Sequence, residues 1–331
     1  MSLLEKKQVD IFKTIIENNN KFLLVNHIRM DPDAFGSLGA FYLLLKKLGK
    51  EVRATNDEAV PENFSFLTKE DLIIPKIDMG EFAPEVIISF DAASLDQLGE
   101  SYSNNKAFFE NIPFIVIDHH ITNPWFWNLN LVDTNASSTC ELVYDLIKDM
   151  WYAQYISPNI ATLLLAWIHT DTNSFYNKNT TSHTLEVAGK LIDLKAENKE
   201  IVFQFFRKKS LEKVRLWWSI MQDIQQESGI TWVSIKKEVY EHTKEKDQGF
   251  KWFINEFLAN VEWTLVALFL YEEESWSIKV SLRSNRDDID VAKICSEFWG
   301  WWHKLAAGFS SNENIIILKE IILNRIKKED L

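Results

Sequence analysis

Cysteine is scarce and long apolar runs are missing, and each absence excludes a class of protein. Two cysteines among 331 residues, Cys140 and Cys295, cannot build a disulfide framework and are typical of the reducing cytoplasm. No segment approaches the ~20 apolar residues of a membrane helix, and the N-terminus, MSLLEKKQVDIFK, is charged where a signal peptide is apolar. The sequence therefore predicts a cytoplasmic globular protein and excludes a membrane protein, a secreted miniprotein and a disordered tail.

Positive charge is also in deficit. The net charge is −12 at pH 7, whereas a protein that binds long duplex nucleic acid needs a basic surface. We therefore exclude non-specific binding of long nucleic acid. A small anionic substrate remains compatible with this charge if a local cationic site, such as metal ions, holds it.

The first half of the chain alternates short apolar runs with segments of helical periodicity. The apolar runs are 22–25, 51–54, 86–90 and 114–117, and the helical segments are 5–18 and 35–48. Short, wholly apolar strands separated by helices predict a doubly wound parallel sheet in an α/β domain, with both faces covered. Ligands of such sheets lie beyond the carboxyl ends of the strands.

The second half predicts a smaller α/β domain. Residues 138–215 are mainly helical, and the highly charged part of that stretch looks like a connection between domains. Beyond it we expect a strand at 230–235, a hairpin of 263–271 with 275–283, and helices at 250–259, 289–298 and 312–327. The predicted parts are a first domain over 1–190, a helical linker over 191–224 and a second domain over 225–331.

Acidic and histidine side chains follow the apolar elements of the first domain. His27, Asp31 and Asp33, spaced H-x3-D-x-D, come after the first strand; the others are Asp91, Asp118-His119-His120 and Asp171. Each has an ordinary structural explanation when taken alone, such as helix capping by Asp31 or Asp33. Together they are expected to converge at one edge of the sheet, where five carboxylates would repel one another unless cations neutralised them.

Aspartate and histidine without thiolate suit a hard to borderline divalent ion such as manganese better than a structural zinc. Two such ions ~3.5 to 4 Å apart would clamp a phosphoryl group and activate a shared water, and the bridging hydroxide would attack phosphorus in line with the leaving oxygen.

These motifs, in this order, resemble the DHH phosphoesterase superfamily. The stretch from Phe298 to Gly308, FWGWWHKLAAG, resembles the DHH-associated C-terminal domain. The stretches NPWFWNLNLVDTNASSTCELVY, AWIHTDTNSF and VSLRSN are similar to one subgroup, the bifunctional oligoribonuclease and pAp phosphatase proteins, also called nanoRNases. The resemblance covers nearly the whole chain, and Met30 stands where the family usually has proline.

The resemblance implies a role for each residue of the motifs. One manganese ion would be held by His27, Asp31 and Asp91, and the other by Asp33, Asp91, His119 and Asp171, so that Asp91 bridges them. Asp118 would orient a histidine, and His120 would lie near the scissile phosphate. Substrate would be bound by Ser137, Ser138 and Thr139, for which simple N-capping is the alternative, and by Arg283, Gly300, His303 and Gly308.

The function implied is a manganese-dependent hydrolase with two activities, in which Mg²⁺ or Co²⁺ can replace Mn²⁺. It would degrade very short RNA to 5′-mononucleotides, as an exonuclease, and dephosphorylate 3′-phosphoadenosine 5′-phosphate (pAp) to AMP. The alternatives are a phosphodiesterase for cyclic dinucleotides or their linear products, an exopolyphosphatase, and a nucleotide-binding regulator without turnover. The expected partners are therefore short RNA and pAp, with no membrane, and a homodimer is left open.

Glycine is unusually rare and tryptophan unusually common. The 10 glycines and 13 tryptophans together make up the share of a chain that glycine alone usually has, about 7%. The tryptophans look turn-like rather than periodic, and several stand where the resemblance leads us to expect glycine: Trp125, Trp127, Trp167, Trp263, Trp276, Trp299, Trp301 and Trp302. One explanation is a tryptophan-rich core or a base-stacking platform. The other is a gene in which UGA encodes glycine, read here as tryptophan, so that all 13 codons are UGA.

Overall fold

The computed structural model consists of two compact units, residues 1–208 and 209–331. It describes residues 4–28, 30–67, 72–75, 77–120, 122–124, 128–241, 247–273 and 277–329, with only the backbone at 63, 247–249, 251, 252 and 301–303. The boundary falls inside the predicted linker 191–224. Ile201 and Phe205 belong to the core of the first unit, whereas Leu216 and Trp217 belong to a core of the second.

The first unit contains a five-stranded sheet in the order β2-β1-β3-β4-β5. All four neighbouring pairs are parallel, which confirms the predicted parallel sheet. The strands are β1 (Lys21–Asn26), β2 (Glu51–Thr55), β3 (Val86–Phe90), β4 (Phe114–Asp118) and β5 (Leu129–Val132). Only β5 was not predicted, because it is short and polar Asn130 interrupts its apolar run.

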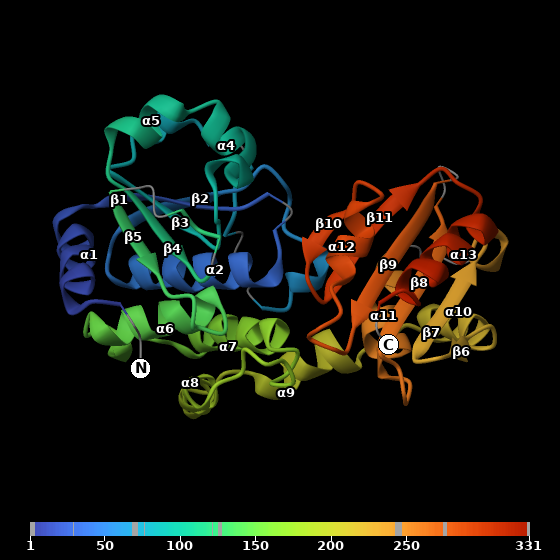
Figure 1. The fold of residues 1–331 in the computed structure, drawn as a ribbon. Coiled ribbons are helices and arrows are strands. Elements are labelled where there is room, and N and C mark those ends of the chain that lie inside the picture. Colours follow the sequence, from blue (N-terminus) through green and yellow to red (C-terminus); the bar gives the residue numbers. More distant parts are fainter. Residues whose placement is uncertain are drawn as a thin grey trace. The chain divides into compact units, whose positions relative to one another are not determined.

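Helices cover both faces of this sheet, as a doubly wound fold requires (Figure 1). Leu24, Ile88 and Ile117 face a core shared with helices on one side, and Leu23 and Ile87 face a second core. The helices of the first face are α1 (Lys6–Asn18), α2 (Pro32–Lys47), α6 (Thr139–Asp149) and α7 (Pro158–Asp171). Short helices supply the second face: α3 (Met79–Phe82), α4 (Gly99–Ser103) and α5 (Lys106–Asn111). The unit ends with α8 (Ser182–Asp193), α9 (Asn198–Val202) and a short π-helix (Phe203–Arg207).

Two helices of the first face have clear start signals in the sequence. The carboxylate of Asp31 accepts from Ala34 N–H at 3.0 Å and caps α2, and Pro32 occupies the first helical position. Pro158 likewise begins α7, whose last residue is Asp171. These ends place Asp33 in the first turn of α2 and Asp171 in the last turn of α7.

The second unit contains a six-stranded mixed sheet in the order β10-β11-β9-β8-β7-β6. Its strands are β6 (Gln225–Glu227), β7 (Ile230–Ile235), β8 (Val266–Glu272), β9 (Ile278–Ser284), β10 (Trp301–His303) and β11 (Ala306–Ser311); its helices are α10 (Leu211–Met221), α11 (Asp247–Glu256), α12 (Val291–Ser296) and α13 (Ile315–Ile326). The predicted antiparallel pairing of β8 with β9 is confirmed. None of the helices described in either unit is both long and apolar enough to cross a membrane.

The tryptophans divide into three groups. Trp151, Trp263 and Trp299 lie at chain reversals. Seven others lie in helices or strands, so the expectation that the tryptophan sites are turn-like was wrong for them: Trp167, Trp217, Trp218, Trp232, Trp252, Trp301 and Trp302. Trp125, Trp127 and Trp276 fall outside the described residues.

Close backbone packing in the second sheet gives a test of the fold. A Cβ atom on Gly308 of β11 would lie 2.6 Å from the carbonyl oxygen of Val280 on β9. Gly308→Ala should therefore lower the free energy of unfolding by about 1 to 3 kcal/mol, because backbone cannot yield as a side chain does. Urea denaturation followed by circular dichroism measures this loss.

Gly189→Ala is the matched control. Gly189 is exposed on α8, and a Cβ there would meet nothing within 4 Å. This replacement should stabilise the first unit by about 0.5 to 1 kcal/mol, because glycine is a poor helix former. Equal effects of the two replacements would contradict the close approach of β9 and β11.

Candidate metal centre

The predicted ligands meet at the carboxyl edge of the first sheet. His27 follows β1, Asp91 follows β3, and Asp118 ends β4, with His119 and His120 directly after it. These strands are neighbours in the order β1-β3-β4. The chain leaves β1 toward β2 on one side and returns to β3 on the other, so the residues lie at the topological switch point, where ligands of such sheets bind.

The first cluster consists of His27, Asp31 and Asp91. The Nε2 atom of His27 lies 3.4 Å from Asp31 Oδ1 and 3.7 Å from Asp91 Oδ2. The other ring nitrogen, Nδ1, lies 2.7 Å from the carbonyl oxygen of Ile28, and this contact turns Nε2 toward the carboxylates.

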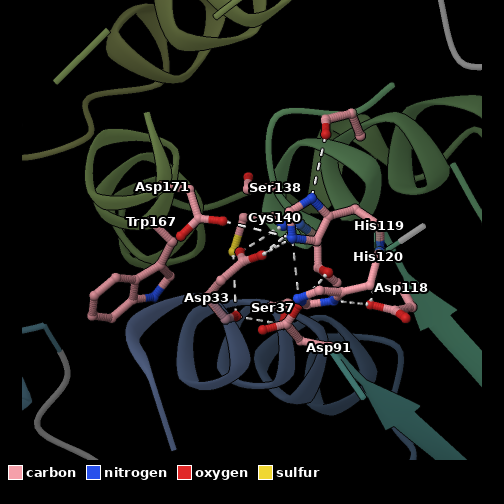
Figure 2. Close-up of polar contacts among 12 residues, drawn as sticks. Asp33, Ser37, Asp91, Asp118, His119, His120, Ser138, Cys140, Trp167 and Asp171 are labelled. Carbon is pink, nitrogen blue, oxygen red and sulfur yellow. Dashed lines mark hydrogen bonds and ion pairs between the residues drawn. The ribbon is translucent and has the colours of Figure 1, made fainter. Parts of the chain in front are cut away.

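The second cluster consists of Asp33, His119 and Asp171, from α2, the end of β4 and α7. The Nε2 atom of His119 lies 3.8 Å from Asp33 Oδ2 and 3.7 Å from Asp171 Oδ2 (Figure 2). Its Nδ1 atom lies 3.3 Å from the carbonyl oxygen of Ala136. Residues far apart in the sequence thus present their donor atoms to a common space.

Asp91 links the two clusters. Its Oδ2 atom faces His27, and its Oδ1 atom lies 3.8 Å from His119 Nε2. The carboxylate is buried, and the backbone of Asp91 has a φ of 57°, a left-handed conformation that costs free energy in a residue other than glycine. A hydrogen bond from Asp91 N–H to the carbonyl oxygen of Ile117, 3.0 Å long, helps to hold that conformation.

Asp118 orients His120. Its Oδ1 atom lies 2.7 Å from His120 Nδ1 and accepts from His119 N–H at 2.8 Å, while its Oδ2 atom accepts from the amide of Asn123 at 2.8 Å. Asp118 is fully buried, whereas the His120 side chain is 40% exposed. The ring is therefore fixed at Nδ1, with Nε2 available to a substrate.

Burial and neighbouring charges together raise the pKa values of three residues of this site. Burial alone lowers the pKa of His27, but hydrogen bonds and charge from Asp31 and Asp91 outweigh it and raise that pKa to about 11. Burial and the charge of Asp91 raise the pKa of Asp33 to about 7. Burial also raises the pKa of Asp171, with a further contribution from the charge of Asp33. Without cations the site therefore holds protons that metal ions would displace.

The N-terminus of α6 supports the carboxylates. Asp33 accepts from the backbone N–H groups of Thr139 at 2.5 Å and Cys140 at 3.0 Å, and the Thr139 hydroxyl donates to Asp91 Oδ1 at 2.8 Å. Positive charge at a helix N-terminus favours a carboxylate there. Thr139 thus contacts a member of each cluster.

The hydroxyls of Ser137 and Ser138 also contact protein groups. Ser138 caps α6 by accepting from Glu141 N–H at 3.1 Å, as the capping alternative predicted. The Ser137 hydroxyl donates to the buried carboxylate of Glu141. The substrate-binding role of Ser137, Ser138 and Thr139 stays a prediction.

Packing between α2 and α7 sets the spacing of Asp33 and Asp171. The buried ring of Trp167 lies directly over Gly36, where an added Cβ would be 1.2 Å from the indole Cδ1. Phe64 and Phe205 also pack against this ring, with centroids 5.0 and 5.1 Å away. The indole nitrogen of Trp167 is buried with no hydrogen-bond partner in the described part of the chain.

The predicted residues of the second unit lie on or next to three neighbouring strands of its sheet, β10, β11 and β9. Ala306 on β11 is paired with both Arg283 on β9 and His303 on β10. The Arg283 Nε donates to Asn255 Oδ1 at 2.8 Å, and burial lowers the pKa of its guanidinium.

Close packing explains why glycine stands at positions 300 and 308, since a Cβ on Gly300 would lie 2.6 Å from the Gly308 carbonyl oxygen. The role of Arg283, Gly300, His303 and Gly308 in substrate binding also stays a prediction.

Sequence reasoning missed the supporting contacts of three residues. It did not assign the hydroxyl of Thr139 to Asp91, the amide of Asn123 to Asp118, or the amide of Asn179, which donates to the carbonyl oxygens of Ser137 at 2.9 Å and Asp171 at 3.3 Å. The only available signal was the proximity of Asn123 to the Asp-His-His motif. Nothing in one sequence shows that residues 48 apart, as Thr139 and Asp91 are, share a hydrogen bond.

The donor set fits metal ions. Among the described residues, three groups have donor atoms within 4.8 Å of one another: His27 with Asp31 and Asp91, Asp33 with His119 and Asp171, and Asp91 with His119 and His120. Each offers only carboxylate oxygen and imidazole nitrogen, which suits hard to borderline divalent cations.

Comparison with known proteins agrees with this geometry. Residues 21–168 match the DHH family, N-terminal domain. A protein of Bacillus subtilis named bifunctional oligoribonuclease and PAP phosphatase NrnA is 27% identical over 92% of this chain and 91% of its own. The protein of the same name from Thermus thermophilus is 30% identical over 86% of this chain and 82% of its own.

A solved structure shows the same fold along the whole chain. An exopolyphosphatase-related protein from Bacteroides fragilis superposes with a TM-score of 0.89 over 99% of this chain and 98% of its own, at 22% identity. The Asp-His-His motif that ends β4, the match over residues 21–168 and the similarity to the two NrnA proteins lead to one conclusion. The chain belongs to the DHH family of phosphoesterases.

Proposed function

We propose that this chain is a manganese-dependent phosphoesterase that degrades very short RNA to 5′-mononucleotides and converts pAp to AMP. The observation that carries the proposal is the position of Asp91, whose two carboxylate oxygens face separate clusters of ligands. Such a shared carboxylate is what a two-metal phosphoesterase needs to hold two ions close together. The names of the relatives support the choice of substrates.

The residues that would hold the ions are those of the two clusters. His27, Asp31 and Asp91 would bind one ion, and Asp33, Asp91, His119 and Asp171 the other. When bound, two divalent ions neutralise phosphoryl oxygens and lower the pKa of a water for attack on phosphorus. Manganese is favoured because the donors are carboxylates and imidazoles without a thiolate.

The remaining residues would bind and orient the substrate. His120, held at Nδ1 by Asp118, presents Nε2 to a phosphoryl oxygen or to the leaving oxygen. Ser137, Ser138 and Thr139 would border the phosphate at the start of α6. Arg283 and His303, paired through Ala306, would hold the far phosphate and base of a short oligonucleotide.

A substrate panel tests the function. The purified chain with Mn²⁺ should release mononucleotides from an RNA dinucleotide and AMP from pAp, while a cyclic dinucleotide and polyphosphate remain intact, as measured by liquid chromatography of the products. Asp91→Asn should lower both activities by about 1,000-fold, because loss of metal-based charge stabilisation costs several kcal/mol in the transition state.

Asp193→Asn is the matched control for that replacement, since Asp193 is an exposed residue of α8. It should leave both rates unchanged. Binding of the dinucleotide without product would indicate a regulator instead of an enzyme, and preferential hydrolysis of polyphosphate or a cyclic dinucleotide would contradict the proposed substrates.

The contact between Thr139 and Asp91 predicts a role in metal affinity. Thr139→Val keeps the shape of the side chain but removes the hydroxyl that donates to Asp91 Oδ1. We expect Mn²⁺ to bind about 10 to 100 times more weakly, as for other groups that orient metal ligands. Titration of free Mn²⁺ by electron paramagnetic resonance measures this without an activity assay.

Two further variants separate orientation from folding. Thr139→Ser keeps a hydroxyl and should restore most of the Mn²⁺ affinity. Thr14→Val removes an exposed hydroxyl on α1 that donates to its own helix and should leave Mn²⁺ binding unchanged. If Thr139→Val binds Mn²⁺ as tightly as the unmodified chain, the hydroxyl does not position Asp91.

Metal binding should release protons near neutral pH. With a pKa of about 11, His27 is protonated in the metal-free protein, and Asp33, with a pKa of about 7, is partly protonated. Both must lose their protons to become ligands, so Mn²⁺ affinity should rise with pH. Isothermal titration calorimetry in two buffers with different ionisation enthalpies counts the protons, and equal binding enthalpies in both would refute proton release.

A further inference from the structure

Three tryptophans occupy backbone positions that are normally reserved for glycine. Trp151, Trp263 and Trp299 have φ angles of 67°, 67° and 62°. A positive φ is a real outlier for a bulky residue, because Cβ then crowds the following carbonyl oxygen. Only three glycines in the described residues have a positive φ, so tryptophan occupies positions of positive φ as often as glycine does there.

Trp151 lies where a helix ends in a Schellman motif. Helix α6 ends at Asp149, and Met150 is its C-cap. The N–H of Trp151 donates to the Lys148 carbonyl at 2.9 Å, and the N–H of Tyr152 donates to the Ile147 carbonyl at 2.9 Å. This pair of hydrogen bonds requires a left-handed residue directly after the cap, a position that is usually glycine.

Trp299 lies in the same motif at the end of α12. Its N–H donates to the Ser296 carbonyl at 3.2 Å, and the N–H of Gly300 donates to the Cys295 carbonyl at 2.9 Å. The residue that must be left-handed is again the tryptophan. It directly precedes Gly300 and strand β10, which carries His303.

Trp263 lies in a tight turn of a different kind. The N–H of Thr264 donates to the Val261 carbonyl at 3.1 Å, which closes a four-residue turn with Trp263 in third place. A positive φ at the third position is the feature of a type II turn that demands glycine. Two helix ends and one turn, in both units of the chain, thus show the same mismatch.

The side chains of these three residues give no reason for tryptophan. Their exposed fractions are 79% for Trp151, 78% for Trp263 and 92% for Trp299. Trp217 shows the contrast: it is 4% exposed on α10, packs against Phe257 with ring centroids 4.8 Å apart, and lies under the ammonium group of Lys213. A base-stacking platform or a tryptophan-rich core would consist of residues like Trp217, which packs against another ring and has no positive φ angle.

We propose that glycine is the native residue at positions 151, 263 and 299. The gene has UGA codons there that encode glycine in the source cells, and the three tryptophans result from translating UGA as tryptophan. The backbone angles support this explanation for three tryptophans, whereas the low glycine count alone suggested it for all 13. Trp167 and Trp217 are buried in packed aromatic surroundings, and the proposal does not extend to them.

The gene and the native protein give the first test. The codons for residues 151, 263 and 299 should all be UGA, and peptides from the source cells should contain glycine at these positions by mass spectrometry. A UGG codon or a tryptophan in the native peptide at any of the three overturns the proposal.

Stability of the chain as it stands gives a second, independent test. Trp151→Gly, Trp263→Gly and Trp299→Gly should each raise Tm by about 2 to 4 °C, because each removes left-handed strain from a chain of this size. Trp217→Gly is the matched control and should lower Tm, since it opens a cavity in a packed core. A lower Tm for the three replacements at positive φ would contradict the proposal.

Discussion

The carboxylate of Asp91 is the constraint on which the site depends. It follows β3, which lies between β1 and β4 in the sheet, and its two oxygens face histidines that follow those neighbouring strands. Its place between these neighbours brings the carboxylate within reach of both clusters. The left-handed backbone of Asp91 adds a local cost, which the surrounding sheet outweighs and which brings both oxygens into the shared space.

The protein neutralises part of the charge that this arrangement creates. Backbone N–H groups of Thr139 and Cys140 donate to Asp33, the Thr139 hydroxyl donates to Asp91, and His120 contacts Asp118. Burial, and after it the charge of neighbouring carboxylates, raises the pKa values of Asp33 and Asp171, so part of the repulsion remains. Metal ions would remove it, so ligand binding and the stability of this edge of the first unit are coupled.

Much of the first unit follows from the sequence for a simple reason. Apolar strands separated by helices pair in parallel, and parallel strands bring their carboxyl ends to one edge, so His27, Asp91 and His119 had to meet once the sheet was predicted. Asp171 was placed by its position at the end of a helix. Contacts that depend on how helices pack, such as Thr139 with Asp91, leave no periodic signal in a single sequence.

Two strands at one edge of the second unit's sheet, β10 and β11, were not predicted from the sequence. Strand β11 reads AAGFSS, which lacks the β-branched residues that mark a strand, and β10 has only three residues. Positive φ angles are also invisible to periodicity. In the sequence, only the low glycine count indicated that some tryptophans stand at positions suited to glycine. The backbone angles then identified Trp151, Trp263 and Trp299 as the strained ones.

Anomalous diffraction from crystals soaked in Mn²⁺ tests the shared carboxylate most directly. Two anomalous peaks should lie on opposite sides of Asp91, one beside His27 and Asp31 and the other beside His119 and Asp171. A single peak, or two peaks of which neither contacts Asp91, would contradict a two-metal centre built on this residue.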